Sequence, residues 1–424
     1  MIYSSVPHHP SVATTTGIQA PDLTTRVSRL PPPKRRGLWA VVAGALGLAP
    51  VLARLTGASA KASPLEFVAF DWSPLASVEP QAVALTYWFD ADENWDTYRV
   101  AIKLTGRRID VKGKPESGDA FRVVAGIDGL KPGMGRIALT HRVSDANPGR
   151  WKVDAVAEAM PQDARHGNRP VTPHRLSSAV ATGASVYAPV ARQRAPGIIL
   201  GAWPALVGLG ALAGLALQTT LARAAGLPVT PVLLLALASC LVGIVGAKIY
   251  YRLTHLGDKA GLLVTGASLQ GFVIGAITVL ALGGALWRLP VGTVLDVTAP
   301  ALLLGQAIGR IGCFFGGCCT GLPTTSRWGL WSSNRRVGVR RVPVQLMESA
   351  SAAILAVSSV AVLRFASPSP QGLVFVASLS AYLVVRQLLF PLRGLPRKTA
   401  HGRVITLAVA SAALIAAGFT AFLS

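Results

Sequence analysis

The feature that most limits how this chain can fold is a series of long apolar segments that begins at Gly197. From Gly197 to the C-terminus there are only three acidic residues, Asp258, Asp296 and Glu348. Seven segments approach the ~20 apolar residues that a helix needs to cross a bilayer, at about residues 198–219, 230–250, 261–286, 294–315, 344–363, 372–392 and 404–423. We therefore expect residues 197–424 to form an all-α, seven-span polytopic membrane domain.

The composition agrees with a membrane protein and excludes other classes. Of the 424 residues, 51% are hydrophobic and only 14% are charged, whereas soluble domains carry about 25% charged residues. The net charge of +22 could indicate a nucleic-acid partner, but the excess Arg and Lys lie mostly between the apolar segments. Anionic lipid headgroups of the membrane are their expected partner, and we expect no nucleic acid. Four cysteines in so long a chain exclude a disulfide scaffold.

The N-terminal part shows the composition of a tail and a targeting segment. Residues 1–36 are rich in Ser, Thr, Pro and Arg and are expected to form a disordered, basic cytoplasmic tail. Residues 37–57 are expected to be a signal anchor or a signal peptide, because the small residues Ala58, Ser59 and Ala60 could form a cleavage site. We favour the uncleaved anchor because the tail is long for a secretory signal. Both alternatives place the next residues outside the cytoplasm.

Residues 62–160 have a different pattern, in which apolar and polar residues alternate in short runs. These runs lie near residues 82–89, 98–104, 121–127, 137–143 and 151–156, and Gly, Pro, Asp and Asn separate them. Such a pattern predicts a small, extracytoplasmic antiparallel β-sandwich. The region holds no cysteine and no cluster with metal-ligand spacing, so we expect an adhesive or spacer role. We interpret residues 161–196 as a polar linker.

The loop from Thr320 to Pro343 is basic although the alternation of spans places it outside. It contains five arginines, Arg327, Arg335, Arg336, Arg340 and Arg341, and no acidic residue. Short basic loops usually lie in the cytoplasm. Either the topology is inverted, or these arginines serve a function on the outer face. The basic N-terminal tail favours the second interpretation.

Three ionisable residues within predicted spans are the candidates for function that we single out, because a charge there is costly. They are Asp296, Arg310 and Arg386, and Arg393 follows Arg386 after nearly two helical turns, which would place both on one helical face. Two guanidinium groups in the outer half of a bundle could bind one phosphodiester, because the planar fork matches phosphate oxygens. The alternative is that each arginine reaches the membrane interface or a helix carbonyl.

The segment around Arg310 is rich in glycine and cysteine. Gly309, Gly312 and Gly321 permit close approach of a lipid or a neighbouring helix. With Gly316 and Gly317 they indicate that the helix ends near Phe315, beside a cavity at the outer leaflet.

Cys313, Cys318 and Cys319 cluster in the same segment. A metal site would need further ligands close in sequence, which are absent. A catalytic thiolate would need a lowered pKa, which Arg310 could provide. Buried, inert thiols are the interpretation that we favour.

These residues resemble a known family. The run from Asp296 to Gly321, DVTAPALLLGQAIGRIGCFFGGCCTG, resembles the signature of the prolipoprotein diacylglyceryl transferase family, in a branch with cysteines there. Residues 266–271 look like its Gly-rich segment, residues 343–349 resemble its Pro-x-Gln-Leu-Tyr-Glu element, and Arg386 and Arg393 have the spacing of its late arginine pair. The resemblance covers about residues 197–424.

The resemblance implies transfer of the diacylglyceryl group of phosphatidylglycerol to the lipobox cysteine thiol of a preprolipoprotein. A thioether forms, glycerol phosphate leaves, and neither a metal nor a soluble cofactor is required. The family acts in the bacterial inner membrane, with its active site toward the outer leaflet. Together with the charge pattern, the resemblance implies catalytic roles for Arg310, Arg386 and Glu348. It also implies substrate-binding roles for Gly309, Gly312, Gln270, Gly321, Arg393 and Gln345.

The chain departs from the family pattern at its proton-handling positions. Gln270 stands at a position where the family carries His. Cys313 and Cys318 stand at the positions of an Asn and a Glu, respectively. Met347 replaces a Tyr, and Phe390 replaces an acidic residue. His255, His401 and Glu348 are the candidates for the general base. Two hypotheses follow: an active transferase, or a non-catalytic membrane protein that retains a phosphatidylglycerol-binding cavity and uses the β domain as a partner-binding module.

Overall fold

The computed structural model describes residues 63–70, 73–75, 78–162, 173–254, 268–366, 370–394 and 401–423. In this part of the chain six helices are long and apolar enough to cross a membrane. They are α4 (Ala202–Ala224), α5 (Val229–Thr254), α7 (Val291–Phe315), α8 (Val344–Phe365), α9 (Leu373–Leu389, continued by the 3₁₀ turn η3, Phe390–Leu392) and α10 (Gly402–Leu423). The apolar α6 (Leu269–Leu286) is shorter.

The predicted polytopic membrane protein is thus confirmed in six long helices. The third predicted span is described only from Leu269 onward, as α6. The predicted tail at residues 1–36 and the predicted anchor or signal peptide at residues 37–57 lie outside the described residues.

The helices belong to two compact units. One unit includes Leu234–Leu289, with most of α5 and α6, and the other holds the β strands, α4 and the helices from α7 onward. Within the first unit, Gly246 of α5 and Gly271 of α6 lie so close that a side chain at either would collide with the backbone of the other helix. Small residues at this crossing therefore allow the two helices to pack.

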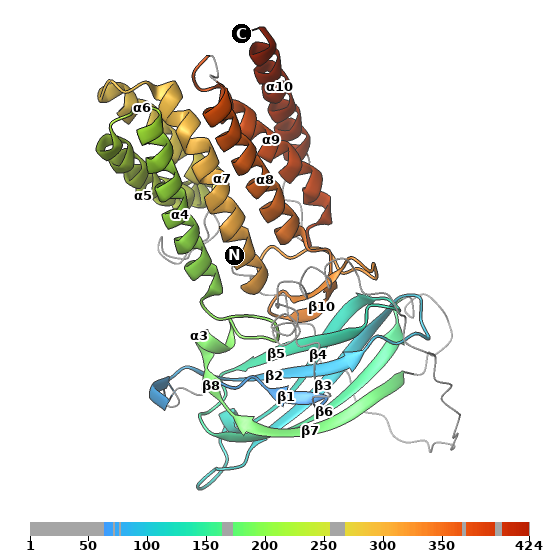
Figure 1. Ribbon diagram of the computed structural model, residues 1–424. Helices are drawn as coiled ribbons and strands as arrows, with labels where there is room; N and C mark the ends of the chain where they lie inside the picture. The colour runs from blue at the N-terminus through green and yellow to red at the C-terminus, as the bar shows by residue number, and fades with distance from the viewer. Residues whose placement is uncertain are drawn as a thin grey trace. The chain divides into compact units, whose positions relative to one another are not determined.

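The β domain consists of two antiparallel sheets (Figure 1). The six-stranded sheet contains β1 (Leu65–Phe67), β2 (Gln81–Asp90), β5 (Arg136–Ser144), β10 (Val337–Arg341) and β9 (Leu330–Ser333) in that order, with β8 (Val186–Tyr187) also paired to β2. The four-stranded sheet has the order β4 (Ala120–Leu130), β3 (Tyr98–Arg108), β6 (Arg150–Pro161) and β7 (His174–Ala184). Short helical turns are η1 (Ser73–Leu75), η2 (Ser117–Asp119) and α3 (Ala188–Ala191).

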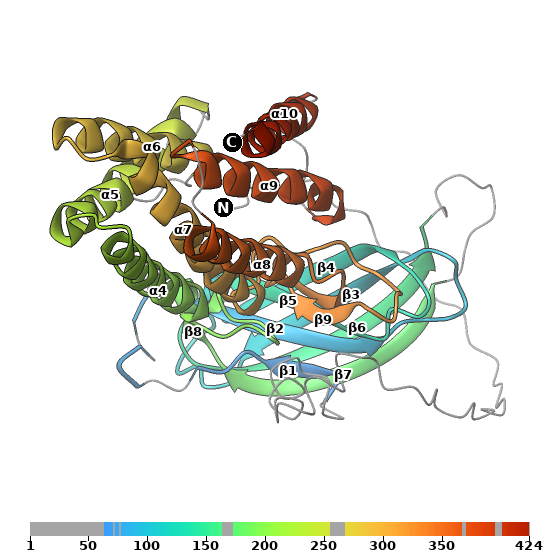
Figure 2. The same cartoon turned by 45° about the horizontal axis from the view of Figure 1, so that its top comes forward.

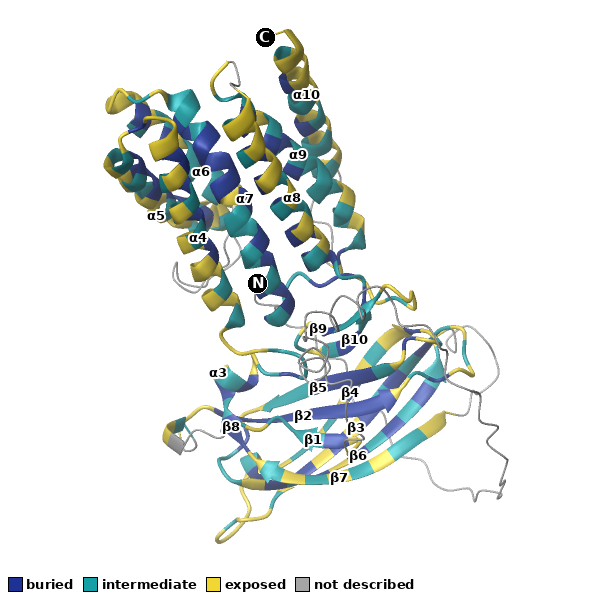
Figure 3. Ribbon diagram, viewed as in Figure 1, coloured by how far each residue is buried: buried dark blue, intermediate teal, exposed yellow. Residues whose placement is uncertain are grey.

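The core of the β domain follows from the alternation of apolar residues. In β3 and β6 every second residue is buried, so each strand has one face toward the other sheet. Strand β2 is different because nine of its ten residues are buried (Figure 3). One face of β2 lies in the core, and the other is covered by α3 near Ala84 and by the indole of Trp331, which stacks on Trp88 at 5.7 Å between ring centroids.

The predicted linker at residues 161–196 is wrong in its second half. Residues 174–184 form β7, which pairs along its length with β6, and residues 186–191 form β8 and α3. The polar composition of the run predicts a linker. It is polar because β7 is an edge strand whose residues alternate between exposed and partly buried positions. Residues 163–172 lie outside the described part.

The loop between α7 and α8 contributes two strands to the β domain. Strand β10 pairs with β5 through Val337 opposite Leu139 and Gly338 opposite Ala138, and β9 pairs with β10. Figures 1 and 2 show this orange hairpin beside the teal strand β5. The β domain is therefore joined to the membrane helices by a continuous sheet, a feature that the alternation pattern did not indicate.

Arginines stabilise this junction. The guanidinium of Arg142 in β5 donates to the carbonyl oxygens of Ala191, Arg194 and Arg335, at 2.5, 2.7 and 2.8 Å. Burial, and then the nearby charge of Arg335, lower the pKa of Arg142 to about 10. Arg335 in turn donates from Nε to the carbonyl of Gly316, at 2.8 Å. Part of the basic character of the loop from Thr320 to Pro343 thus has a structural cause.

We predict that Arg142→Met lowers the free energy of unfolding by at least about 2 kcal/mol, because three carbonyls in partly buried hydrogen bonds lose their donor. Thermal unfolding of the detergent-solubilised protein measures the change. Arg122→Met is the control, because Arg122 is exposed in β4 and its replacement should change stability by less than about 0.5 kcal/mol. Equal unfolding temperatures for the two variants would contradict this account of the junction.

Candidate functional site

A buried carboxylate surrounded by three arginines lies where α7, α8 and the end of α9 meet. Glu348, in the second turn of α8, has a side chain that is 0% exposed. Arg310 forms an ion pair with its Oε2 and Arg393 with its Oε1, and Nη1 of Arg386 lies 3.6 Å from Oε2. The arginines predicted from the sequence therefore converge on a single carboxylate. We call these four residues the Arg–Glu cluster.

Each arginine reaches the carboxylate from a different local structure. Arg310 comes from the last two turns of α7, and Arg386 from the last turn of α9. The prediction that Arg386 and Arg393 share a helical face is wrong. Helix α9 ends at Leu389, and Arg393 has an extended backbone after η3. A hydrogen bond from the amide of Gly394 to the carbonyl of Thr320, at 3.0 Å, holds this segment beside the loop after α7.

The charges of the cluster do not balance. Three guanidiniums face one carboxylate, so the cluster has a net charge of +2 if all four groups are ionised. The Nε atoms of Arg310 and Arg393 are buried and have no hydrogen-bond partner within the described residues. A buried donor without an acceptor is unfavourable, so the arrangement is suited to binding an anion.

The predicted glycines serve packing between parts of the protein. A side-chain carbon at Gly312 would lie 3.1 Å from Cβ of Leu206, and one at Gly309 would lie 3.7 Å from Val207, both in α4. Gly321 packs against the backbone of Val342. Of the two possibilities raised by the sequence, a lipid or a neighbouring helix, the structure shows the neighbouring helix for Gly309 and Gly312.

The two glutamines predicted to bind substrate lie in different surroundings. Gln345 is buried and donates from Nε2 to the carbonyl of Cys318, at 3.0 Å, so it holds the cysteine-containing turn. Gln270 lies exposed in the first turn of α6, in the other compact unit, and its Oε1 accepts a hydrogen bond from Ser268. Its predicted role stays a prediction.

Asp296 has a structural role that the sequence did not indicate. Its carboxylate accepts hydrogen bonds from the amides of Gly372 and Phe375, at 2.7 and 2.9 Å. These amides belong to the N-terminal end of α9, where unpaired donors and the helix dipole favour a negative group. Asp296 thus fixes α9, which carries Arg386, against α7.

Two polar residues near the cluster were missed by the sequence analysis. Gln306, one turn before Arg310 in α7, donates to the hydroxyl of Tyr382 at 2.7 Å. Tyr382 is buried and lies within electrostatic range of Arg310. Polar side chains within otherwise apolar spans are the signal that could have identified them.

The remaining predicted candidates lie apart from the cluster or outside the description. His401 is exposed just before α10, and His255 lies outside the described residues. Cys313 and Cys319 lie beside Arg310, whose Nη1 is 3.6 Å from Sγ of Cys313, and the thiol of Cys318 donates to the carbonyl of Cys313. Within the described residues these thiols do not form a set of three metal ligands.

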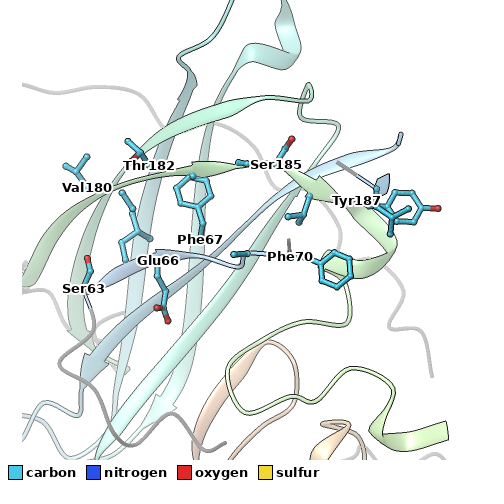
Figure 4. A pocket seen from close by; sticks show the side chains of 15 residues that line it. Ser63, Glu66, Phe67, Phe70, Val180, Thr182, Ser185 and Tyr187 are labelled. Carbon is cyan, nitrogen blue, oxygen red and sulfur yellow. The ribbon is translucent and has the colours of Figure 1, made fainter. Parts of the chain in front are cut away.

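A separate hollow of about 950 Å³ lies in the β domain (Figure 4). It is lined by β1, by the segment that follows β1, and by the end of β7 with β8. None of its lining residues belongs to the Arg–Glu cluster. The predicted cavity at the outer leaflet therefore stays a prediction.

Comparison with known proteins identifies the family. The family model for prolipoprotein diacylglyceryl transferase matches residues 194–424, which include every residue of the Arg–Glu cluster. The chain belongs to the prolipoprotein diacylglyceryl transferase family. The match begins shortly after α3, so the β strands up to β8 lie outside it, whereas the hairpin β9–β10 lies within it.

Several relatives have the name phosphatidylglycerol–prolipoprotein diacylglyceryl transferase. The protein of Thermosynechococcus vestitus is 30% identical over 152 residues, which are 34% of this chain and 55% of the relative. The protein of Clostridium tetani is 29% identical over 210 residues, which are 47% of this chain and 84% of the relative. A second such transferase of Clostridium perfringens is 40% identical over 119 residues, which are 25% of this chain and 46% of that protein. The chain thus spans about half of the length of the first of these relatives.

We predict that Glu348→Gln destabilises the protein, because it leaves two buried cations, Arg310 and Arg393, and the partly buried Arg386 without a counter-charge. Removing one partner of a buried ion pair costs about 3–5 kcal/mol. Thermal unfolding in a neutral detergent measures the loss. Glu158→Gln removes the same charge from an exposed pair with Lys103 and should cost at most about 1 kcal/mol. A Glu348→Gln protein as stable as the control would contradict the ionic role of this carboxylate.

Proposed function

We propose that this protein transfers the diacylglyceryl group of phosphatidylglycerol to the lipobox cysteine thiol of a preprolipoprotein. The protein would act in the bacterial inner membrane, with the Arg–Glu cluster open to the outer leaflet. Family membership supports the reaction class. The observation that carries the proposal is the net positive charge of a buried arginine cluster with unpaired donors.

The charge of the cluster suits the charge that develops in this reaction. Phosphatidylglycerol has one negative charge on its phosphodiester. When the bond between the glyceryl carbon and the phosphate oxygen breaks, the glycerol phosphate that leaves gains a second negative charge, since the second pKa of a phosphate monoester is about 6. A net charge of +2 therefore stabilises the leaving group more than the bound lipid, as catalysis requires.

Glu348 has a positioning role in this proposal. Three arginines without a counter-charge would repel one another in a medium of low dielectric constant. The carboxylate orients the Nη atoms of Arg310 and Arg393 toward itself, which leaves their Nε atoms as donors for phosphate oxygens. Both carboxylate oxygens of Glu348 are already paired with arginines, so we do not assign the general base to Glu348.

The non-catalytic alternative has one specific observation in its favour. Gln270 stands where the family pattern carries His, and an amide does not accept a proton near neutral pH. Under this alternative the arginines bind phosphatidylglycerol without reaction, and the β domain binds a partner protein. Lipid binding without thioether formation would support it.

We predict that Arg310→Ala and Arg393→Ala lower the transfer rate by at least about 100-fold, the usual loss when one group that stabilises a developing anion is removed. The assay uses full-length protein in phosphatidylglycerol vesicles with a lipobox peptide, and mass spectrometry detects the thioether. Arg364→Ala is the control, because Arg364 is exposed in the last turn of α8.

Three results would count against the proposal in different ways. Absence of thioether with folded wild-type protein would contradict the transferase and favour the non-catalytic alternative. Unchanged rates for both arginine variants would remove the role of the cluster. A loss as large for Arg364→Ala would show that the substitutions act through folding.

A further inference from the structure

The turn that ends α7 has the geometry of a Schellman motif, with a cysteine at each end. Gly317 has a φ of 66°, and its amide donates to the carbonyl of Phe314, at 3.4 Å. The amide of Cys318 donates to the carbonyl of Cys313, at 3.1 Å. Two such hydrogen bonds around a left-handed glycine define this motif, and the side chains at its two ends often contact each other. Here these side chains are the thiols of Cys313 and Cys318.

The backbone brings the two cysteines within the reach of a disulfide bond. The amide nitrogen of Cys318 lies 3.1 Å from the carbonyl oxygen of Cys313. With the standard bond lengths on either side, this contact keeps the two Cα atoms within about 7 Å of each other. A disulfide can join Cα atoms up to about that separation. The side chain of Cys318 also turns toward its partner, since its Sγ lies 3.8 Å from the same carbonyl oxygen.

Contacts with neighbouring elements hold the turn in this shape. Nε2 of Gln345 in α8 donates to the carbonyl of Cys318, at 3.0 Å, and Nε of Arg335 donates to the carbonyl of Gly316, at 2.8 Å. Both ends of the turn are therefore fixed by groups outside α7. Because the two cysteines are already ordered, little further entropy is lost when a bond joins them.

The other cysteines are less suited as partners. Cys319 follows Cys318 directly, and the Cα atoms of adjacent residues are only about 3.8 Å apart across a trans peptide bond. That separation is below the roughly 4.4–6.8 Å that disulfides usually span. Cys240 lies in the part of α5 that belongs to the other compact unit. The geometry thus favours the pair of Cys313 and Cys318.

We propose that Cys313 and Cys318 form a reversible intramolecular disulfide bond, with a small-molecule or protein disulfide as the oxidant. Cys318 is partly exposed and is the thiol that the oxidant reaches first, whereas Cys313 is buried and completes the bond. With the site toward the outer leaflet, as proposed above, the turn faces the side of the membrane on which disulfides persist. The inference does not depend on the transferase function, because a protein that transfers no lipid can form the same bond.

The exchange balances with one oxidant disulfide consumed. The thiolate of Cys318 attacks one sulfur of the oxidant and expels the other as a thiolate, which leaves a mixed disulfide. The thiolate of Cys313 then attacks the sulfur of Cys318 and expels the second oxidant thiolate. The two protein thiols lose two electrons and two protons, and the oxidant takes them up as it is released as two thiols.

This bond would change the surroundings of one arginine of the Arg–Glu cluster. Nη1 of Arg310 lies 3.6 Å from Sγ of Cys313, and the same arginine forms an ion pair with Glu348. Oxidation replaces the thiol beside this guanidinium by a sulfur that has neither a proton nor an ionised form. The redox state of the pair therefore reaches the cluster through a single side chain.

The test is oxidation of the full chain in nanodiscs with mixtures of reduced and oxidised glutathione. Free thiols are blocked with N-ethylmaleimide, and the chain is digested with chymotrypsin, which cleaves after Phe314 and Phe315, between the two cysteines. We expect mass spectrometry to find two peptides joined through Cys313 and Cys318, while Cys319 carries the label. Reduction with dithiothreitol should separate the peptides.

Single variants and a denatured control show whether the fold selects the pair. Cys318→Ala should lose the linked peptides, whereas Cys319→Ala and Cys240→Ala should oxidise at the same glutathione ratio as the wild type. In a chain denatured with dodecyl sulfate, Cys313 should pair with both of the later cysteines. The native chain should reach half oxidation at a ratio at least about tenfold more reducing, because its thiols are preorganised.

Three results would overturn the inference. They are labelling of Cys313 at every glutathione ratio, linkage of Cys313 to Cys319 in the native chain, and the same mixture of pairs in native and denatured chains. The thioether assay described above is a separate measurement. A protein that forms the disulfide and transfers no lipid contradicts only the transferase, and an active protein without the disulfide contradicts only this inference.

Discussion

The ion pairs between Glu348 and three arginines are the interaction on which the rest of this site depends. They join the end of α7, the start of α8 and the segment after α9 through one buried carboxylate. The cluster holds its arginines in place and, in the proposed function, its excess positive charge attracts a further anion. This combination of rigidity and excess charge is what a site for a lipid phosphate requires.

The β domain has a direct structural connection to this cluster. Strand β10 extends the sheet from β5, and Arg341 donates from Nη1 to the carbonyl of Gly321, at 3.0 Å. Gly321 forms a bridge with Arg393. The β domain, for which an adhesive or spacer role stays a prediction, thus contacts the segment that holds Arg393 through the loop after α7. Removal of the β domain would expose the edge of a hairpin that belongs to the family region.

The sequence allowed the helices and the charged residues of the site to be predicted, because length, apolarity and intramembrane charge are local signals. Arg310 and Arg386 stand out for this reason, whereas the resemblance to the family pointed to Glu348. Contacts between distant residues were not accessible in the same way. The cap that Asp296 provides to α9 and the pairing of β10 with β5 depend on tertiary structure. The edge strand β7 was mistaken for a linker because edge strands and linkers are both polar.

The central claim is that the Arg–Glu cluster binds the phosphate of an anionic phospholipid. Cryo-electron microscopy of the full chain in nanodiscs of phosphatidylglycerol tests it most directly. The account predicts density for a phosphate within hydrogen-bond distance of the Nε atoms of Arg310 and Arg393, with Glu348 still paired to both arginines. A well-resolved map in which the lipid phosphates lie elsewhere and both Nε atoms contact only protein would contradict it.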